Sequence, residues 1–507
     1  MLDERKPAAG AAKPDQNFLI RKYFEDHSLI EYNRKSFNNF IENEIPKIIK
    51  EVGDIVPTVI PPDVNDFRIR FDNIRIEKPK ITEADGSRKD VYPMEARLRQ
   101  LTYSAPMYLD VTVHIDGVQR EAFQTPIGKM PVMLKSKYCN LFGLSKEDLI
   151  KRGEDPYDPG GYFVLNGNER ALITVEDLVP NKMFVQESNG PSRFTAKIFS
   201  HKDSYNIPHV IEQMRDGIIY ISFTRFKRVP IMYVIKALGL IKDQDIMQLI
   251  CDEKMYDEVY INLHDLKEIS TSEDALNALA AKGSITVQPK ESKTDKTLEQ
   301  LDQFLLPHIG ISAKERALKA YNLCKIIKKF LQISKDGVQP ADKDHYKNKK
   351  LKLSGDLMAE LMRVNMKVLV NDVLYNFQRL VKRGKFQSVK TIIRDKLLTS
   401  RIKSAMATGT WVGGRKGISQ NLDRINFVAT TSHLARVVSL LSATQENFEA
   451  RELHCTHWGR LCPIETPEGT PIGLRKNMAM LCEITQEEVQ EDKFRKSLES
   501  LGLKKCI

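Results

Sequence analysis

Hydrophobic spacing along the chain switches several times between the helical and the strand period. Apolar residues over 19–49 recur every three or four positions with an interruption near Pro46, so two helices are expected there. Apolar residues over 109–115 alternate with polar ones and run into an Asp-Gly pair, which predicts a β-hairpin with His114 on its polar side. The amino-terminal part is therefore expected to mix helix and sheet.

The later parts of the chain repeat this mixture. Strand-like runs at 217–226 and 230–238 precede charge-mixed sequence with helical spacing. A longer helix is predicted after Ser354 or Asp356, either of which can cap it. Its core-facing stripe is expected to be Met362, Met366, Leu369, Val373, Phe377 and Leu380. Because 507 residues are too many for one core, the sequence predicts an α+β, multidomain protein of mixed helix and sheet.

The charge balance favours an anionic partner. Lys and Arg number 78 against 67 Asp and Glu, which gives a net charge of +11. The window 341–430 alone carries 19 basic and 7 acidic residues, so the excess is concentrated there. A solvated face of basic helices explains the same clustering, so charge alone leaves both interpretations open.

The cysteines and the amino end indicate a location. The seven cysteines form no paired C-x-x-C pattern, which fits reduced thiols better than a disulfide framework. The first residues carry acids and prolines where a signal peptide needs an apolar core, and no apolar run approaches the roughly 20 residues of a membrane span. A cytoplasmic protein is expected.

The stretch 451–479, RELHCTHWGRLCPIETPEGTPIGLRKNMA, is the one around which the rest is expected to be organised. Prolines recur every four residues with glycines among them, so neither a helix nor a central strand is expected to run through it. A stiffened loop of this kind suits a surface that holds polar groups still beside a ligand. Its polar groups are His454, His457, Arg460, Glu465, Glu468, Arg475 and Lys476.

A second loop precedes this stretch. Gly413, Gly414 and Gly417 bracket Arg415 and Lys416, which predicts a mobile basic loop whose backbone can approach a phosphate. Loops of this kind are common, so this one indicates phosphate binding only in combination with the sequence that follows it.

Several long motifs carry a family resemblance. They are ARLRQLTYSAPMYLDVTV, PIGKMPVMLKSKYCN, DPGGYFVLNGNERALI, ADKDHYKNKKLKLSGDLMAELM, ISQNLDR, SHLAR and HWGRLCPIETPEG followed by IGLRKN. In this order they resemble the second-largest subunit of multisubunit DNA-directed RNA polymerases, over essentially residues 17–485. The chain resembles in particular the amino-terminal half made by archaea that encode this subunit in two pieces, although a truncated intact subunit would look similar.

The resemblance implies an architecture of protrusion, lobe and fork along one side of a DNA cleft. The expected divisions are a disordered leader at 1–16, a protrusion at 17–185 and 346–405, an inserted lobe at 186–345, a fork at 406–485 and a C-terminal tail at 486–507. Exposed basic residues of the protrusion are expected to contact nucleic acid, with Arg97, Lys129, Lys135 and Arg170 as candidates.

The resemblance also implies site residues. Gln420 and Arg436 would contact the RNA strand, while Asp423 and His433 would shape the same surface. The residues expected near the active centre and the incoming nucleotide are Arg451, Arg460 and Glu468. The candidates for DNA contact are Arg415, Lys416, Lys382 and Arg383. For each, a hydrogen bond that braces a loop is the alternative role.

By the same resemblance this chain carries no catalytic residue and no metal. Nucleotidyl transfer needs clustered carboxylates holding Mg²⁺, which the family takes mainly from its largest subunit, and no D-x-D-x-D run is present here. Zinc is expected in other subunits. The implied partners are the largest subunit, the carboxyl-terminal half of the split subunit, small assembly subunits, DNA template, RNA transcript and nucleoside triphosphates, without a membrane. The isolated chain is expected to be inactive.

Other interpretations remain open. A zinc or thiol enzyme would use His454, Cys455, His457 and Cys462, but all four lie within nine residues, so one short loop would have to surround the ion. The acidic pair within 342–344 resembles a magnesium site, yet neighbouring lysines are expected to neutralise it. A stand-alone nucleic-acid-binding protein fits composition and charge equally well.

Overall fold

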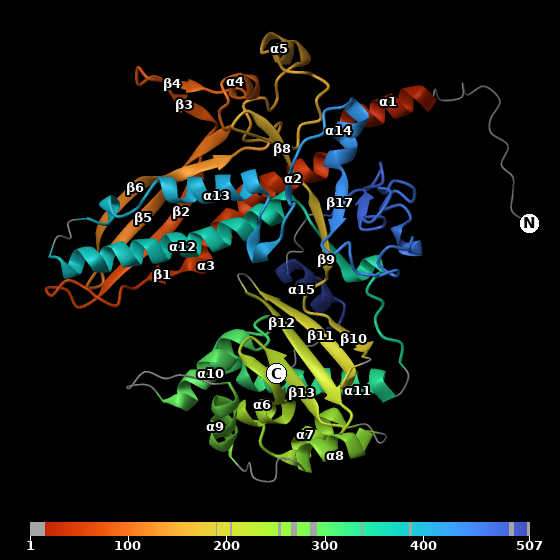
Figure 1. Cartoon of the computed structure of the whole chain (residues 1–507). Helices are drawn as coiled ribbons and strands as arrows, with labels where there is room; N and C mark the ends of the chain where they lie inside the picture. Colours follow the sequence, from red (N-terminus) through yellow and green to blue (C-terminus); the bar gives the residue numbers. More distant parts are fainter. Residues whose placement is uncertain are drawn as a thin grey trace, which may run out of the picture. The chain divides into compact units, whose positions relative to one another are not determined.

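The computed structural model describes residues 16–188, 190–202, 205–251, 255–264, 271–283, 292–335, 338–384, 388–485 and 491–503 (Figure 1). The chain divides into two compact units, unit 1 with Met1–Glu176 and Leu351–Ile507 and unit 2 with Asp177–Lys350. Helices and several small sheets occur in them, which confirms the expected α+β class. Residues 1–15 of the expected leader and part of the expected tail lie outside the described residues.

The amino-terminal elements of unit 1 are α1 (Gln16–Asp26), α2 (Glu31–Asn39), the π-helical turn η1 (Phe40–Glu44) and α3 (Ile45–Val52). The two expected helical stretches are present, as α1 and the continuous run of α2, η1 and α3, but the interruption expected near Pro46 is only the π-helical turn η1 directly before α3. Pro46 lies in the first turn of α3, and η1 joins α2 to α3 without a break. The apolar residues of α1 do not form a core, since Leu19 and Ile20 are more than half exposed.

The main sheet of unit 1 is antiparallel. Its strands lie in the order β1 (Asp54–Ile55), β2 (Phe67–Ile76), β5 (Ser104–Ile115) and β6 (Val118–Pro131). Asp116 and Gly117, both with positive φ, form the tight turn between β5 and β6, which confirms the predicted hairpin. Alternate residues of β5 are buried, and His114 lies on the more exposed side opposite Arg68.

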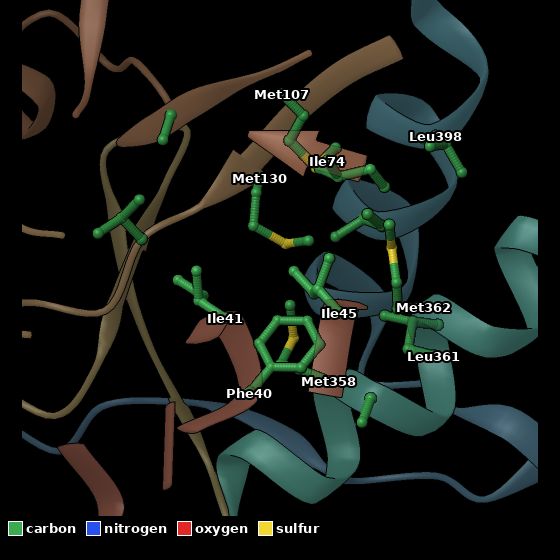
Figure 2. Packing of buried hydrophobic residues seen from close by; sticks show 14 of the residues in the cluster. Phe40, Ile41, Ile45, Ile74, Met107, Met130, Met358, Leu361, Met362 and Leu398 are labelled. Carbon is green, nitrogen blue, oxygen red and sulfur yellow. The ribbon is translucent and has the colours of Figure 1, made fainter. Parts of the chain in front are cut away.

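One face of this sheet is covered by helices. Figure 1 shows α12 (Ser354–Lys382) and α13 (Lys396–Thr408) running along it, and α3 packs on β2. In the close view of Figure 2, Phe40 and Ile45 meet Met358 and Met362 of α12, with Met130 of β6 on the other side. All five are buried, so this cluster is the core of unit 1.

The long helix α12 is close to its prediction. Met362, Met366, Leu369, Val373 and Phe377 are buried, and Leu380 packs against the same core. Of the two proposed caps, Asp356 is confirmed, because its carboxylate accepts a hydrogen bond from the backbone N–H of Leu353 at 3.0 Å. Ser354 instead donates its hydroxyl to the carbonyl of Asn33 on α2 at 3.2 Å.

Two small sheets carry the later part of unit 1. One has the order β16 (Ser419–Asn421), β8 (Asn168–Leu172) and β7 (Phe163–Leu165). The other has the order β15 (Lys349–Lys352), β9 (Thr174–Leu178), β17 (Arg436–Ser439) and β18 (Arg475–Asn477). The helix α14 (Phe427–Leu434) lies between β16 and β17 in sequence. The remaining elements of unit 1 are β3 (Lys80–Thr82), β4 (Arg88–Asp90), α4 (Pro93–Leu98), α5 (Lys146–Lys151), the short helices η5 (Val389–Thr391), η6 (Val412–Gly414) and η7 (Cys455–His457), and α15 (Glu491–Ser500).

Unit 2 contains an antiparallel meander and a set of helices. The strands, in sheet order, are β10 (Met183–Glu187), β11 (Ser192–Lys202), β12 (Tyr205–Met214), β13 (Ile219–Phe223) and β14 (Phe226–Pro230). The helices are α6 (Ile231–Ala237), α7 (Asp243–Ile250), α8 (Tyr256–His264), α9 (Ser272–Lys282), α10 (Lys293–Phe304), η3 (Ala313–Glu315), α11 (Arg316–Lys335) and η4 (Tyr346–Asn348). Among the described residues no helix is both long and apolar enough to cross a bilayer.

The strand expected at 230–238 is wrong, because α6 occupies residues 231–237. Ile231, Met232, Val234 and Ile235 are all buried, so the run has no exposed face and its spacing cannot separate a short buried helix from a buried strand.

Candidate nucleic-acid interface

Gln420, Asp423, His433 and Arg436 lie close together in unit 1. Gln420 is on β16, Asp423 follows that strand, His433 is in the last turn of α14 and Arg436 opens β17. The side-chain amide of Gln420 donates to the carbonyl of Gly417 at 2.9 Å, and its oxygen lies 3.1 Å from Nε2 of His433. A strand, a helix and a second strand thus bring residues spread over 17 positions into one cluster.

The hydrogen bonds fix the protonation of His433. Its Nδ1 accepts from the backbone N–H of Asp423 at 3.1 Å, so the neutral ring carries its proton on Nε2 and donates it to Gln420. Burial lowers the pKa of His433 and the nearby Arg436 lowers it further, against the opposing carboxylate of Asp423. That carboxylate lies 3.6 Å from Nδ1, but with a neutral ring the contact is not an ion pair. The cluster is therefore held by hydrogen bonds.

Arg436 is the cation of the cluster. In the described part of the chain its half-buried guanidinium makes no hydrogen bond and no ion pair. Burial lowers its pKa, the carboxylates of Asp423 and Glu465 raise it, and Arg475 lowers it. A partly desolvated arginine with all five N–H donors available is suited to a bidentate contact with a phosphate.

The basic glycine loop has the backbone that its sequence predicts. Gly413, Gly414 and Gly417 all have positive φ, between 73° and 77°, with open space where a Cβ would be. Lys416 is exposed, whereas Arg415 lies 3.8 Å from the carboxylate of Glu360 on α12. The loop therefore offers one exposed cation beside the Gln420 cluster.

The other two DNA-contact candidates belong to a different place. Lys382 and Arg383 are exposed at the carboxyl end of α12, 22 and 23 residues after Glu360. At about 1.5 Å per residue this puts them roughly 33 Å along the helix from the residue that Arg415 faces. The four candidates consequently do not form one surface.

Arg451 braces the proline-rich loop from within. Its Nη1 donates to the carbonyls of Thr470 at 2.6 Å and Ile472 at 3.0 Å, and its Nη2 donates to Ala443 at 2.8 Å and Gln445 at 3.3 Å. Four of its five N–H groups are thus used by the protein itself. Nearby, Gly473 has a φ of +71° and approaches the backbone of Arg451 so closely that a Cβ would lie 2.3 Å from its carbonyl.

The loop is otherwise irregular, as expected, apart from η7 and the edge strand β18. Arg460 and Glu468 are exposed; Arg460 donates to the carbonyl of Thr456 at 3.1 Å, and no bond of the Glu468 carboxylate is found in the described residues. Glu465 accepts a short hydrogen bond from the hydroxyl of Ser432 on α14. Arg460 and Glu468 are accordingly the outward-facing members of the predicted active-centre set.

The proposed metal and thiol sites find little support in the geometry. Cys455 is exposed with its sulfur 3.9 Å from Nδ1 of His454, while His457 is buried. Asp344 pairs with Lys349 at 3.2 Å, as the neutralisation hypothesis expects. Within the described ranges no group of three or more His, Cys, Asp or Glu side chains is placed to hold a metal ion.

The expectation of exposure fails for three of the four protrusion candidates, Arg97, Lys135 and Arg170. Arg97 is engaged by glutamates from two neighbouring segments. Lys135, whose pKa burial lowers, donates to backbone carbonyls of the 156–158 turn. Lys129 is exposed and Arg170 is half-buried, with its guanidinium 3.5 Å from the carbonyl of Ser419.

A network of charged residues beside the cluster was missed from the sequence. Arg424 donates to both carboxylate oxygens of Glu169, at 2.6 and 3.0 Å, to Asp158 at 3.0 Å and to the hydroxyl oxygen of Tyr162 at 2.8 Å. Arg97 approaches from the other side and also donates to Glu169, at 2.8 Å. All five residues lie within the motifs that carry the family resemblance, but their spacing in the sequence does not show which of them contact each other.

A buried ion pair between β9 and β18 was also not predicted from the sequence. Lys476 and Glu176 are both buried and lie 3.2 Å apart. Because β9 carries Glu176 and β18 carries Lys476, the pair ties the proline-rich loop to the strand on the far side of β17.

Comparison with known proteins identifies the family. A family model described as RNA polymerase beta subunit matches residues 28–400, and one described as RNA polymerase Rpb2, domain 3, matches residues 420–484. The chain belongs to the RNA polymerase beta subunit family. Within this family it is 42% identical over 495 residues to the DNA-directed RNA polymerase subunit Rpo2N of Methanocaldococcus jannaschii, with 96% of this chain and 98% of that protein covered.

Another relative in the RNA polymerase beta subunit family is longer. The DNA-directed RNA polymerase subunit Rpo2 of Saccharolobus solfataricus is 40% identical over 489 residues, covering 96% of this chain but only 43% of that protein. Together with the Rpo2N subunit of Methanococcus vannielii, 40% identical over its full length, this confirms the expected likeness to the amino-terminal half of the archaeal second-largest subunit.

Proposed function

We propose that this chain takes part in DNA-directed RNA synthesis by lining one side of the DNA cleft and presenting residues 417–436 to the RNA–DNA hybrid in the cytoplasm. The names of its relatives support a role as a polymerase subunit. The observation that carries the RNA-facing part is the half-buried guanidinium of Arg436, unbonded within the described residues, beside the oriented amide of Gln420.

The chemistry of this surface fits a strand that must slide. Arg436 offers charge to phosphate, and Gln420 offers a neutral hydrogen bond to phosphate or sugar. Neither group reads a base edge, so contact does not depend on sequence. Lys416, exposed on the neighbouring loop, adds a second cation on a flexible stem.

A companion polypeptide is proposed to cover an apolar surface of unit 1. Outside the segment proposed to face the hybrid, large hydrophobic residues are exposed throughout 448–481: Phe448, Leu453, Trp458, Ile464, Ile472, Met480 and Leu481. The Rpo2 relative has more than half of its length beyond the matched part. We therefore assign this surface to the polypeptide that corresponds to that remaining part.

Tryptophan fluorescence tests the companion. Trp458 is 75% exposed and Trp411 is 4% exposed, so covering the surface should shift the emission of Trp458 to shorter wavelength. The shift should disappear in Trp458→Phe, which leaves Trp411 as the only indole. Titration of the companion without any shift in the wild-type chain would remove this assignment.

Catalytic metal is assigned to other subunits. Nucleotidyl transfer needs carboxylates that hold two Mg²⁺ ions, and we propose that the largest subunit supplies most of them. We expect the isolated chain to make no RNA from template and nucleoside triphosphates in the presence of Mg²⁺. RNA synthesis by the chain alone would contradict this division of labour.

Reconstituted polymerase tests the RNA contact. Arg436→Ala and Gln420→Ala should each slow transcript elongation and shorten the lifetime of the elongation complex. The loss in the arginine variant should be greatest at low salt and smaller at high salt, because its phosphate contact is ionic and salt already screens it in the wild type. Arg75→Ala is the matched control, since Arg75 is exposed on β2 in the same unit. Normal elongation in both site variants would refute the RNA-facing role.

A further inference from the structure

The network around Arg424 joins segments that lie far apart in sequence. Arg424 lies 255 positions after Glu169 and 266 after Asp158, yet it bonds both. Its guanidinium also lies 4.9 Å from the ring centre of Tyr162, whose hydroxyl donates to Asp158 at 2.8 Å. Arg97 also donates hydrogen bonds to Glu169 and to the hydroxyl oxygen of the same tyrosine.

Glu169 holds the 422–424 segment in two ways. Its backbone carbonyl accepts from the N–H of Leu422 at 3.0 Å, which extends the pairing of β8 with β16. Its carboxylate then receives the guanidinium of Arg424 two residues later. Backbone and side chain of one residue thus fix both neighbours of Asp423, and this determines where the N–H of Asp423 points.

From Asp423 the contacts continue directly into the site. The N–H of Asp423 donates to His433, His433 donates to Gln420, and Gln420 donates to Gly417. No link in this series is longer than 3.1 Å. Each donor and acceptor has a single partner within the series, so we expect a displacement at residues 422–424 to reach the Gln420 amide.

The electrostatics make the network hard to replace. Burial raises the pKa of Glu169, but the hydrogen bonds and charges of Arg424 and Arg97 outweigh it, so the carboxyl stays ionised. A planar guanidinium can bond both oxygens of Glu169 and Asp158 at once, whereas an ammonium cannot reproduce this geometry.

We propose that Arg424 and Glu169 are positioning residues that set the orientation of the Gln420 and His433 side chains for contact with the RNA strand. This inference rests on the proposed function of the Gln420 surface. Neither residue needs to touch nucleic acid, because both act through Asp423.

A double-mutant cycle in the reconstituted polymerase tests the positioning role. Arg424→Ala should shorten the lifetime of the elongation complex about tenfold and Arg424→Lys about threefold. In a Gln420→Ala background the same Arg424→Ala change should cost less than about twofold, since the group it positions is gone. Arg99→Ala, which removes an arginine bonded to Glu83 and Glu95 in the same unit, should have no effect.

Losses that add fully in the double variant would overturn the inference, because a merely structural arginine would act independently of Gln420. Wild-type lifetime in Arg424→Ala would overturn it as well. If Gln420→Ala and Arg436→Ala alone leave elongation intact, the proposed function fails instead. Hydrogen exchange of the full chain then decides the inference: Arg424→Lys should raise exchange of the 417–436 amides about tenfold over Arg99→Ala, and unchanged exchange would refute it.

Discussion

Mild acid should destabilise unit 2 through a single buried imidazole. His209 on β12 is fully buried and stacks on Phe223 with ring centres 5.4 Å apart. Its Nδ1 donates to the carbonyl of Ile207 at 3.0 Å, and its Nε2 accepts from the N–H of Leu306 at 3.1 Å. Leu306 has a φ of +44°, so this acceptor also holds a strained backbone. Protonation of Nε2 would remove the bond to Leu306.

The magnitude follows from the pKa. Burial lowers the pKa of His209 from 6.5 to about 4, with smaller contributions from His308 and Lys319 against the carbonyl of Ile207. Between pH 6.5 and pH 4 His209 is protonated in the unfolded chain but neutral in the folded chain. The free energy of unfolding therefore falls as the pH decreases through this range, and His209 adds no further change below pH 4. At about 1.4 kcal/mol per pH unit, the loss is about 3 kcal/mol.

The measurement needs a probe within unit 2, since both tryptophans belong to unit 1. Met232 on α6 is buried there, so its oxidation by peroxide as a function of urea, read by mass spectrometry, reports the unfolding of this unit. The wild-type chain should lose about 3 kcal/mol more between pH 7 and pH 4 than His209→Gln, which cannot titrate. Equal pH dependence in the two chains would refute the assignment of a neutral buried imidazole.

Three further outcomes are expected in urea unfolding followed by tryptophan fluorescence. Gly355→Ala would place a Cβ 2.1 Å from the carbonyl of Ser36, so α2 and α12 must separate at a cost of about 1–3 kcal/mol or more; an unchanged midpoint would contradict that close approach. Lys476→Ala removes the cation beside the buried carboxylate of Glu176 and should cost about 3–5 kcal/mol, with Lys476→Arg closer to wild type. Phe377→Ala should cost about 3–5 kcal/mol through the cavity it leaves, and a loss under about 1 kcal/mol would mean that the helix closes over the site.

Hydrophobic periodicity predicted the elements that bury one face and expose the other. In β5 every second residue is buried, and in α12 the buried residues lie on one face of the helix. In both elements the hydrophobic pattern of the sequence therefore matches the burial. The same reasoning failed where that contrast is missing. Residues 231–237 have no exposed face, and the apolar residues of 19–24 lie on a helix without a core against it.

The candidate site was predictable where its parts are close in sequence. Gln420, Asp423, His433 and Arg436 come from two neighbouring motifs, and the short elements between them bring the side chains together. The network that holds this segment was not predictable, because Arg424 meets acids more than 250 positions away and only the folded chain shows which arginine meets which carboxylate. Charge counts could not separate the exposed cations from those engaged inside the protein.

Arg436 and Arg451 are the same residue type but differ in how many of their N–H groups already donate hydrogen bonds within the protein, and this difference decides which of them can bind an anion. Both are arginines of the segment on which the family resemblance depends, and both are half-buried. Arg451 uses four of its five N–H groups on backbone carbonyls, so binding a nucleotide through them would release the loop that it braces. Arg436 has no such bond in the described residues, so an anion can take its donors without loss elsewhere. We therefore propose the phosphate contact for Arg436, whereas Arg451 fixes the shape of the loop.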